Sequence, residues 1–220
     1  GLCNPHNPYG VSYRKEDLEH IMALCEKYNL YIMNDEIWSD IIFPEAPFNS
    51  IYLLGNERCR RVMSVFGWSK SFGIAGMRIG CVYTTDPALF EGMVEKSDVM
   101  STAGGISSLS QIAGTACMHN YDWVDAFLVH LKGNRDYAVD RLKHMPLVKA
   151  YAPRATYLLY VDIRAFGMKS EDFTDYMKQK VKLALVSGGE KFFGQGSEGY
   201  IRICFATSRG ILEEGLNRLE

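Results

Sequence analysis

The sequence has no excess of charge of either sign, no long apolar run and no basic leader. Its 220 residues carry 24 lysines and arginines against 26 aspartates and glutamates. A protein that binds nucleic acid normally presents a basic face, so we expect no nucleic-acid partner. No apolar run reaches the roughly 18 residues that a membrane helix needs, so we expect no membrane partner. The lack of a basic and apolar leader predicts a cytoplasmic protein.

Cysteine pairs and histidine clusters are missing as well. None of the six cysteines forms a C-x-x-C pair, and most of them lie in apolar patterns. This distribution is typical of small core residues in a reducing compartment, not of a disulfide framework. The five histidines show no spacing that suits a metal ion, so we expect no metal site.

What the sequence does contain is an alternation of apolar runs and amphipathic stretches. We predict strands at residues 1–3, 30–36, 60–67, 77–85, 155–164, 183–189 and 200–206. The apolar run at 30–36 is typical of a buried parallel strand. The stretches between them predict helices at 12–29, 86–100, 107–120, 121–145, 170–181 and 208–220. This order indicates an α/β protein. The long helix at 121–145 is the natural hinge, which predicts a large part at residues 1–132 and a smaller part at 133–220.

Local signals predict how three of the helices begin. Ser12 and Ser170 precede amphipathic stretches and are candidate N-caps. Asp86 and Pro87 together are typical of a helix start. By contrast, "GQGSEG" at 194–199 matches the G-x-G-x-x-G pattern, but the segment after it reads as a strand and not as a helix. A dinucleotide site needs that helix, so we interpret these residues as a glycine-rich loop.

Polar side chains follow several of the predicted strands. Asp35 ends the run "LYIMND", Lys70 follows "VMSVFG", and Asn7 lies in the Asn-Pro turn after residues 1–3. In open α/β sheets ligands bind at the carboxyl ends of strands, so these side chains are candidates for one site. Arg78 and Arg202 lie beside or inside apolar patterns, where each needs an anion from the protein or from a ligand.

This set of side chains suits pyridoxal 5'-phosphate. The cofactor needs a lysine amine for a Schiff base and a carboxylate to keep its ring nitrogen protonated. Its ring hydroxyl needs a donor, and its phosphate needs hydroxyls and an arginine. A second arginine can bind the carboxylate of an amino acid as a planar fork. The simpler interpretations are a solvated Lys70, a helix cap at Asp35, and a structural ion pair at Arg78.

Four motifs in this order resemble the fold-type I aminotransferases of class I and II. "NPHNPYG" is similar to N-P-x-N-P-T-G, "NDEIWSD" contains a D-E-x-Y-like stretch, "SKSFGIAGMRIG" is similar to S-K-x-x-x-x-x-G-x-R-x-G, and "GYIRICFA" resembles the C-terminal arginine strand. The resemblance implies a mainly parallel sheet with helices in a partial cofactor domain, followed by a small α/β C-terminal domain. It assigns the Schiff base to Lys70, the ring nitrogen to Asp35, the ring hydroxyl to Asn7, the phosphate to Arg78 and the substrate carboxylate to Arg202.

The sequence departs from the family pattern at two positions. Trp38 stands where the family usually has a tyrosine that bonds the ring hydroxyl, and an indole N–H donates but cannot accept. Gly67 stands where many relatives have a phosphate-binding serine, which makes Ser69 the nearer candidate. The resemblance also implies that the N-terminal part of the family is missing, and that the parent protein is a homodimer. Residues 101–111 resemble a stretch that approaches the partner's site, or they form a plain loop and helix cap.

The resemblance leaves the reaction open. Arg78 in "GMRIG" favours an aminotransferase that uses an amino acid and a keto acid, with Lys70 removing the Cα proton. "CNPHNP", "ATYLLYVDIR" and the C-terminal strand and helix look like the MalY/PatB group of C–S β-lyases. A regulatory domain with the aminotransferase fold is another alternative. We expect these 220 residues alone to be inactive and to bind the cofactor weakly, and an inactive fragment is the last alternative.

Overall fold

The computed structural model describes residues 1–101 and 104–220, which divide into two compact units. The first unit contains residues 1–6 and the described part of 11–126, and the second contains residues 7–10 and 127–220. The division at 126–127 lies within helix α4 (Tyr121–Lys143). The predicted domain boundary after residue 132 lies in the same helix. The roles that we assign to the two domains stay predictions.

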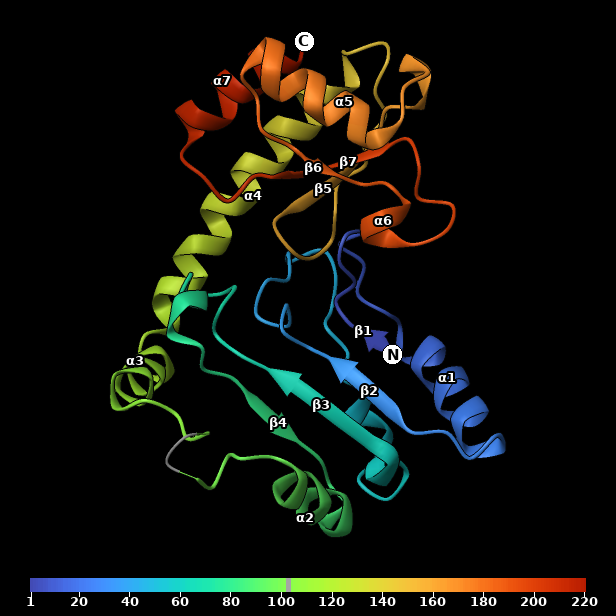
Figure 1. Ribbon diagram of the computed structural model, residues 1–220, viewed down its shortest axis with the longest axis vertical. Helices are drawn as coiled ribbons and strands as arrows, with labels where there is room; N and C mark the ends of the chain where they lie inside the picture. The colour runs from blue at the N-terminus through green and yellow to red at the C-terminus, as the bar shows by residue number, and fades with distance from the viewer. Residues whose placement is uncertain (102–103) are drawn as a thin grey trace. The chain divides into compact units, whose positions relative to one another are not determined.

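The sheet of the first unit has four neighbouring strands (Figure 1). They are β1 (Leu2–Cys3), β2 (Ile32–Asp35), β3 (Val62–Phe66) and β4 (Cys81–Tyr83), in this order across the sheet. The first three strands are parallel and β4 is antiparallel to β3. The helices of this unit are α1 (Lys15–Lys27), α2 (Pro87–Lys96), α3 (Ser108–Met118) and the start of α4. The mainly parallel sheet that the sequence predicts is therefore present.

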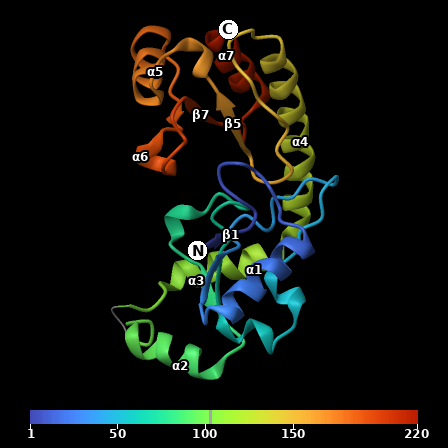
Figure 2. The ribbon, with the colours of Figure 1, turned by 90° about the vertical axis from the view of Figure 1, so that its right-hand side faces the viewer.

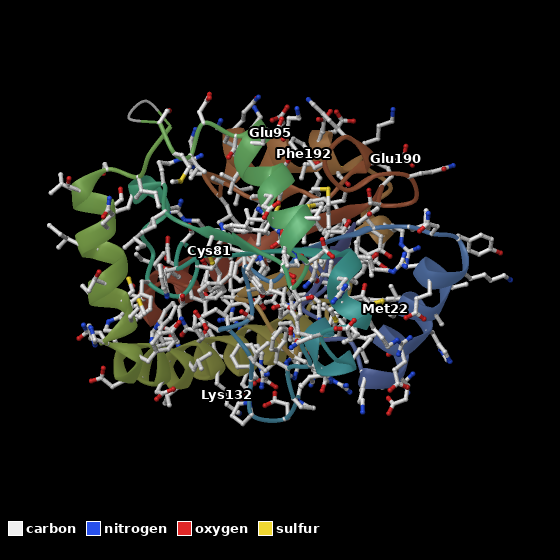
Figure 3. All side chains as sticks on the ribbon, turned by 90° about the horizontal axis from the view of Figure 1, so that it is seen from below. Met22, Cys81, Glu95, Lys132, Glu190 and Phe192 are labelled. Atoms are coloured by element: carbon white, nitrogen blue, oxygen red, sulfur yellow. The ribbon has the colours of Figure 1, made fainter. Side chains whose placement is uncertain are left out.

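The two faces of this sheet differ in their cover. On one face Leu18 and Met22 of α1 pack with Ile32 and Val62 in a buried core; Figure 3 labels Met22. On the other face Met33 is 68% exposed, and Val65 and Val82 are exposed too. The sequence predicts a buried strand at 30–36, but this is wrong for β2, whose side chains alternate between buried and exposed.

The sheet of the second unit is antiparallel. Its strands β5 (Leu158–Asp162), β7 (Tyr200–Cys204) and β6 (Val186–Ser187) pair in the order β5-β7-β6. Figure 2 shows α5 (Ser170–Tyr176), α6 (Glu190–Phe193) and α7 (Arg209–Leu219), which belong to this unit. The first four residues of β5 are all buried. Of the helices that the structure describes, none is long and apolar enough to cross a membrane.

The predicted helix starts are confirmed at Asp86 and wrong at Ser12. The Asp86 carboxylate accepts the backbone N–H of Leu89 at 2.8 Å, and Pro87 is the first residue of α2. Helix α1 begins after Arg14, and the Ser12 hydroxyl donates to the backbone oxygen of Pro47 instead. Ser12 thus ties two loops together and leaves the helix start to the residues that follow it.

The glycine-rich loop at 194–199 is confirmed, and the cap at Ser170 is wrong. Helix α5 begins after Lys169, and the Ser170 hydroxyl accepts the backbone N–H groups of Gly199 and Tyr200. In return the Glu198 carboxylate accepts the backbone N–H of Ser170. This reciprocal pair of contacts fastens the loop to the first turn of α5.

The turn at residues 7–10 belongs to the second unit because of close backbone contacts. The carbonyl oxygen of Gly10 accepts the backbone N–H groups of Arg154 at 2.8 Å and Ala155 at 2.9 Å. Gly10 has φ +61, and a Cβ there would lie 2.4 Å from the side chain of Pro153. A residue with a side chain would not fit in this position.

Candidate functional site

Asp35 lies at the carboxyl end of β2, on the open face of the first sheet. Its Oδ1 accepts the backbone N–H of Ile37 at 3.0 Å. A hollow of about 600 Å³ lies beside it, and Met33, Val65 and Val82 are among the residues that line it. The carboxylate is half-buried, and its second oxygen can accept a hydrogen bond from a ligand. This position agrees with the rule that ligands bind at the carboxyl ends of parallel strands.

The residues on either side of Asp35 are fixed on the covered face of the sheet. The buried carboxylate of Glu36 accepts hydrogen bonds from Asn34 Nδ2 at 2.9 Å, Ser50 Oγ at 2.8 Å and Tyr83 OH at 2.7 Å. Burial and the contact with Glu36 raise the pKa of Tyr83. The sequence motifs do not predict this cluster. The only signal for it is the run of three polar residues, "NDE", at the end of an apolar strand.

Lys70 lies in the turn that follows β3, the strand next to β2. The backbone N–H of Phe72 donates to the carbonyl of Trp68 at 3.0 Å and closes this turn. Lys70 Nζ lies 5.5 Å from the centroid of the Trp38 ring, and Trp38 is 4% exposed. Lys70 forms no ion pair with any residue that the structure describes. Its amine is therefore held by an aromatic face, which leaves its nitrogen open to a reactant.

Packing explains the glycine at position 67, where many relatives have serine. A Cβ on Gly67 would lie 3.2 Å from the carbonyl oxygen of Ile79 and 3.3 Å from the Cα of Gly80. A side chain at this position would have to push two backbone segments apart. Ser69 is half-buried in the next turn, two residues closer to Lys70, and remains the hydroxyl candidate for a phosphate.

Arg78 lies just before β4 in an unusual backbone conformation. Its φ is 53°, in the left-handed region that residues other than glycine seldom adopt. The side chain is exposed, so the prediction that it carries a cost of burial is wrong. Within the described residues it forms no ion pair, which speaks against the structural ion pair that the sequence left open. The guanidinium is thus available to an anionic ligand.

Arg202 lies in the middle of β7 and contacts Asn7, which shares the second unit with it. Arg202 Nη1 donates to Asn7 Oδ1 at 3.1 Å. Because a guanidinium can only donate, this contact fixes the amide so that Nδ2 is the end left for another partner. The guanidinium carbon also lies 5.6 Å from the ring centroid of Phe193 in α6, a contact that the sequence motifs do not predict.

The predicted site residues thus fall into two sets. The first unit holds Asp35, Trp38, Ser69, Lys70 and Arg78, and the second holds Asn7 and Arg202. The chemical groups of the two sets are those that a pyridoxal phosphate needs: an amine without an ion-pair partner, a carboxylate with an oxygen available to accept, an amide N–H and two arginines. The stretch 101–111, predicted to approach a partner's site, contains residues 102–103, which lie outside the described residues.

Comparisons with known proteins give the same family as the motifs. Residues 2–219 match the model of the family described as aminotransferase class I and II. Over 98% of its length the chain is 31% identical to an aspartate aminotransferase of Pyrococcus horikoshii, of which it covers 54%. It is 30% identical to the cystathionine beta-lyase PatB of Bacillus subtilis over all of its length and 56% of that protein.

Solved structures of both kinds are similar to the chain. Cystalysin of Treponema denticola, which contains a pyridoxal 5'-phosphate cofactor, has a TM-score of 0.92 at 26% identity. An aromatic aminotransferase of Pyrococcus horikoshii has a TM-score of 0.88 at 28% identity. Each match covers 99% of this chain, but only 55% and 57% of the solved chains. The chain therefore spans about half the length of the proteins that it matches.

Proposed function

Because the chain belongs to the aminotransferase class I and II family, we propose that the protein carrying it is a pyridoxal-phosphate-dependent aminotransferase that acts on an α-amino acid. The family depends on this cofactor, and solved relatives contain it. The observation that carries the proposal is the placement of Asp35 and Lys70. Asp35 ends β2 and Lys70 lies in the turn after β3, the adjacent parallel strand, and Lys70 forms no ion pair with the residues that the structure describes.

We propose the cofactor contacts that the family resemblance implies for each residue. The Asp35 carboxylate would accept a hydrogen bond from the protonated ring nitrogen, and Asn7 Nδ2 would donate to the ring hydroxyl. Ser69 and Arg78 bind the phosphate, because a hydroxyl and a guanidinium both donate to phosphate oxygens. Trp38 supports the Lys70 side chain through its ring, 5.5 Å from Nζ, instead of the hydroxyl contact typical of the family.

The chemistry that this chain supplies is proton transfer at Lys70. Bound pyridoxal phosphate acts as an electron sink for the substrate carbon. Arg202 binds the carboxylate of the amino acid as a planar fork and orients its Cα–H bond. Lys70 Nζ would remove the Cα proton of the bound amino acid and would give a proton back in the return step, which is the proton transfer that a transamination needs. Asp35 keeps the proton on the ring nitrogen throughout.

A β-lyase is the second candidate, favoured by the similarity to PatB and cystalysin. The same Lys70, Asp35 and Arg202 would serve that reaction. The difference is that the bond from Cβ to sulfur breaks after the Cα proton has been removed. Arg78, exposed and without an ion pair in the described part of the chain, leads us to prefer transamination.

The full protein should be incubated with cystathionine without a keto acid, and separately with amino acids and 2-oxoglutarate. Glutamate formed only in the second reaction would support the aminotransferase. Steady release of pyruvate and a thiol in the first reaction would replace it with the β-lyase. If neither reaction occurs while the protein still binds the cofactor, the regulatory domain becomes the better explanation.

We further propose that the protein works as a cytoplasmic homodimer with a large cofactor domain up to residue 132 and a small domain from 133. Exposed apolar side chains on α3, Leu109 and Ile112, support a contact with a second copy. We also propose that residues 1–220 alone have little activity. The uncovered face beside Asp35, with Met33 68% exposed, supports this.

A further inference from the structure

A tyrosine at the start of α4 joins the Lys70 turn to a second loop. Trp68 Nε1 donates to the Tyr121 hydroxyl at 3.1 Å, and this hydroxyl donates to Asp40 Oδ2 at 3.4 Å. The direction is fixed, because an indole N–H only donates and an ionised carboxylate only accepts. Trp68 belongs to the turn after β3, and Asp40 belongs to the loop after β2. One hydroxyl therefore contacts both loops.

Ring contacts fasten the other end of the Lys70 turn to the same helix start. The ring of Phe72 meets that of Tyr121 edge-on, with centroids 5.7 Å apart. It also stacks on Trp123, with centroids 5.6 Å apart and an angle of 22°. The residues two before and two after Lys70 are thus both held by the first turn of α4. These ring contacts do not depend on the hydroxyl.

The loop after β2 carries the aromatic ring on which Lys70 rests. Trp38 is buried, and its carbonyl accepts the backbone N–H of Ile41 at 2.9 Å, one residue beyond Asp40. The placement of Lys70 Nζ over Trp38 therefore depends on the spacing of the two loops. A tyrosine hydroxyl is protonated and able to donate near neutral pH, and burial raises the pKa of Tyr121 further.

We propose that the Tyr121 hydroxyl is a positioning group for Lys70, because it fixes the Lys70 turn relative to the loop that carries Trp38 and Asp40. This inference rests on the proposed function, in which Lys70 is the amine that reacts with an aldehyde. Tyr121 takes no part in the chemical step. Without its hydroxyl, the turn is held by ring contacts alone, and Lys70 Nζ occupies the productive position for less of the time.

The test uses the full protein freed of cofactor, with pyridoxal and cyanoborohydride as the probe. The Lys70 amine condenses with the aldehyde and releases water. Cyanoborohydride then delivers hydride to the imine carbon while the nitrogen takes a proton, and peptide mass analysis measures the label. Tyr121→Phe keeps the ring and loses two hydrogen bonds, so we expect labelling of Lys70 to slow about five- to tenfold.

Two controls separate positioning from a general change of the protein. Tyr137→Phe removes a hydroxyl of the same helix, one that accepts from Arg141 at 2.9 Å, and should leave the rate at Lys70 unchanged. Lys96, 81% exposed at its side chain, should be labelled at the same rate in every variant. Equal rates at Lys70 in Tyr121→Phe and the parent would overturn the inference, as would a parallel slowing at Lys96.

Substitutions at Asp40 give a second test if Tyr121→Phe folds poorly. Asp40→Asn keeps an oxygen that can accept a hydrogen bond from the Tyr121 hydroxyl, so Lys70 in this variant should be labelled nearly as fast as in the parent. Asp40→Ala should slow the labelling of Lys70 as Tyr121→Phe does. A normal labelling rate at Lys70 in Asp40→Ala would contradict the proposed role of the hydrogen bond between Tyr121 and Asp40. If the parent is not labelled at Lys70 at all, the proposed function fails, and not merely this inference.

Discussion

The two units place their functional side chains differently on their sheets. In the first unit Asp35 ends a parallel strand and Lys70 lies in the turn after the next one. In the second unit Arg202 lies in mid-strand, paired in register with Tyr160 on one side and Val186 on the other. A turn has fewer backbone hydrogen bonds than a central strand, so it needs other contacts to hold its shape. In the proposed function, the proton-transfer group would therefore lie on a turn with aromatic anchors, and the carboxylate-binding group on a strand.

The two sheets also differ in how they are covered. Leu158, Leu159, Tyr160 and Val161 of β5 are all buried, which means that both faces of that strand are packed. The first sheet is packed on one face only, and Met33 is exposed on the other. Removal of apolar side chains should therefore cost much more stability in the second unit than on the open face of the first.

Lys70→Ala should have the largest effect, because it removes the amine on which the proposed chemistry depends. We expect turnover and the absorbance of the lysine-bound cofactor to disappear together in the full protein. Lys70→Arg should fail in the same way, because a guanidinium stays protonated near neutral pH. Lys96→Ala, an exposed lysine in α2, is the matched control and should keep full activity. Normal turnover in Lys70→Ala would rule out the assigned cofactor chemistry.

Arg202→Gln should weaken the binding of the amino-acid substrate and leave the proton transfer largely intact. A charge-assisted hydrogen bond contributes about 1.5–3 kcal/mol, so kcat/KM should fall roughly 10- to 100-fold, mainly through KM. Phe193→Leu removes only the ring that faces the guanidinium, 5.6 Å away, and should give a smaller change of the same kind. Arg60→Gln, an exposed arginine paired with Glu57, controls for the lost charge. A fall in kcat alone would contradict the division between binding and chemistry.

Paired truncations measure the difference in cover between the sheets. Leu159 lies in β5 and is 1% exposed. Leu159→Ala should lower the free energy of unfolding of the protein by about 2–5 kcal/mol. Met33→Ala on the open face should change it by no more than about 0.5 kcal/mol. Denaturant unfolding followed by tryptophan fluorescence gives both values. Equal losses would show that the open face is covered in solution, and the contrast would not hold.

The smallest expected effect is that of alkaline pH on the free energy of unfolding, which the ionisation of Tyr160 tests. Burial raises its pKa from 10.0 to about 12, because the neutral hydroxyl is favoured in the folded chain. The stabilisation is complete below pH 10 and is lost as the pH rises towards 12. In Tyr160→Phe the free energy of unfolding should fall less steeply over this range than in the parent. An unchanged slope would show that another group governs the alkaline transition.

The sequence predicts the fold well because its signals are local. The strands at β2 and β3, the helix start at Asp86 and the loop at 194–199 follow from apolar periodicity and turn residues within a few positions. The exposure of Met33 does not follow from the sequence, because an apolar side chain on an open face reads like one in a core. The sequence pattern predicts that the Ser170 hydroxyl caps its own helix, but this hydroxyl accepts from backbone N–H groups 29 and 30 positions away.

The site shows the same limit. The motifs predict Lys70, Asp35 and Arg202 as site residues, and the structure adds the side chains that contact or surround them. Tyr121 lies 53 positions from Trp68, and no spacing rule connects a tyrosine to a tryptophan at that distance. Glu36 follows Asp35 directly, yet it is buried and accepts hydrogen bonds from Asn34 of its own strand and from Ser50 and Tyr83 of two other segments. Supporting contacts of this kind depend on the fold and become visible only with it.

The turn from Asn7 to Gly10 limits how this protein can be divided. A piece made of residues 127–220 would keep Arg202 but lose the Asn7 oxygen, and the backbone N–H groups of Arg154 and Ala155 would lose the carbonyl of Gly10. No single break in the chain separates the two units intact. An exchange of the second unit between related proteins by recombination would therefore have to bring a compatible tetrapeptide with it, so the two units are constrained to be inherited together.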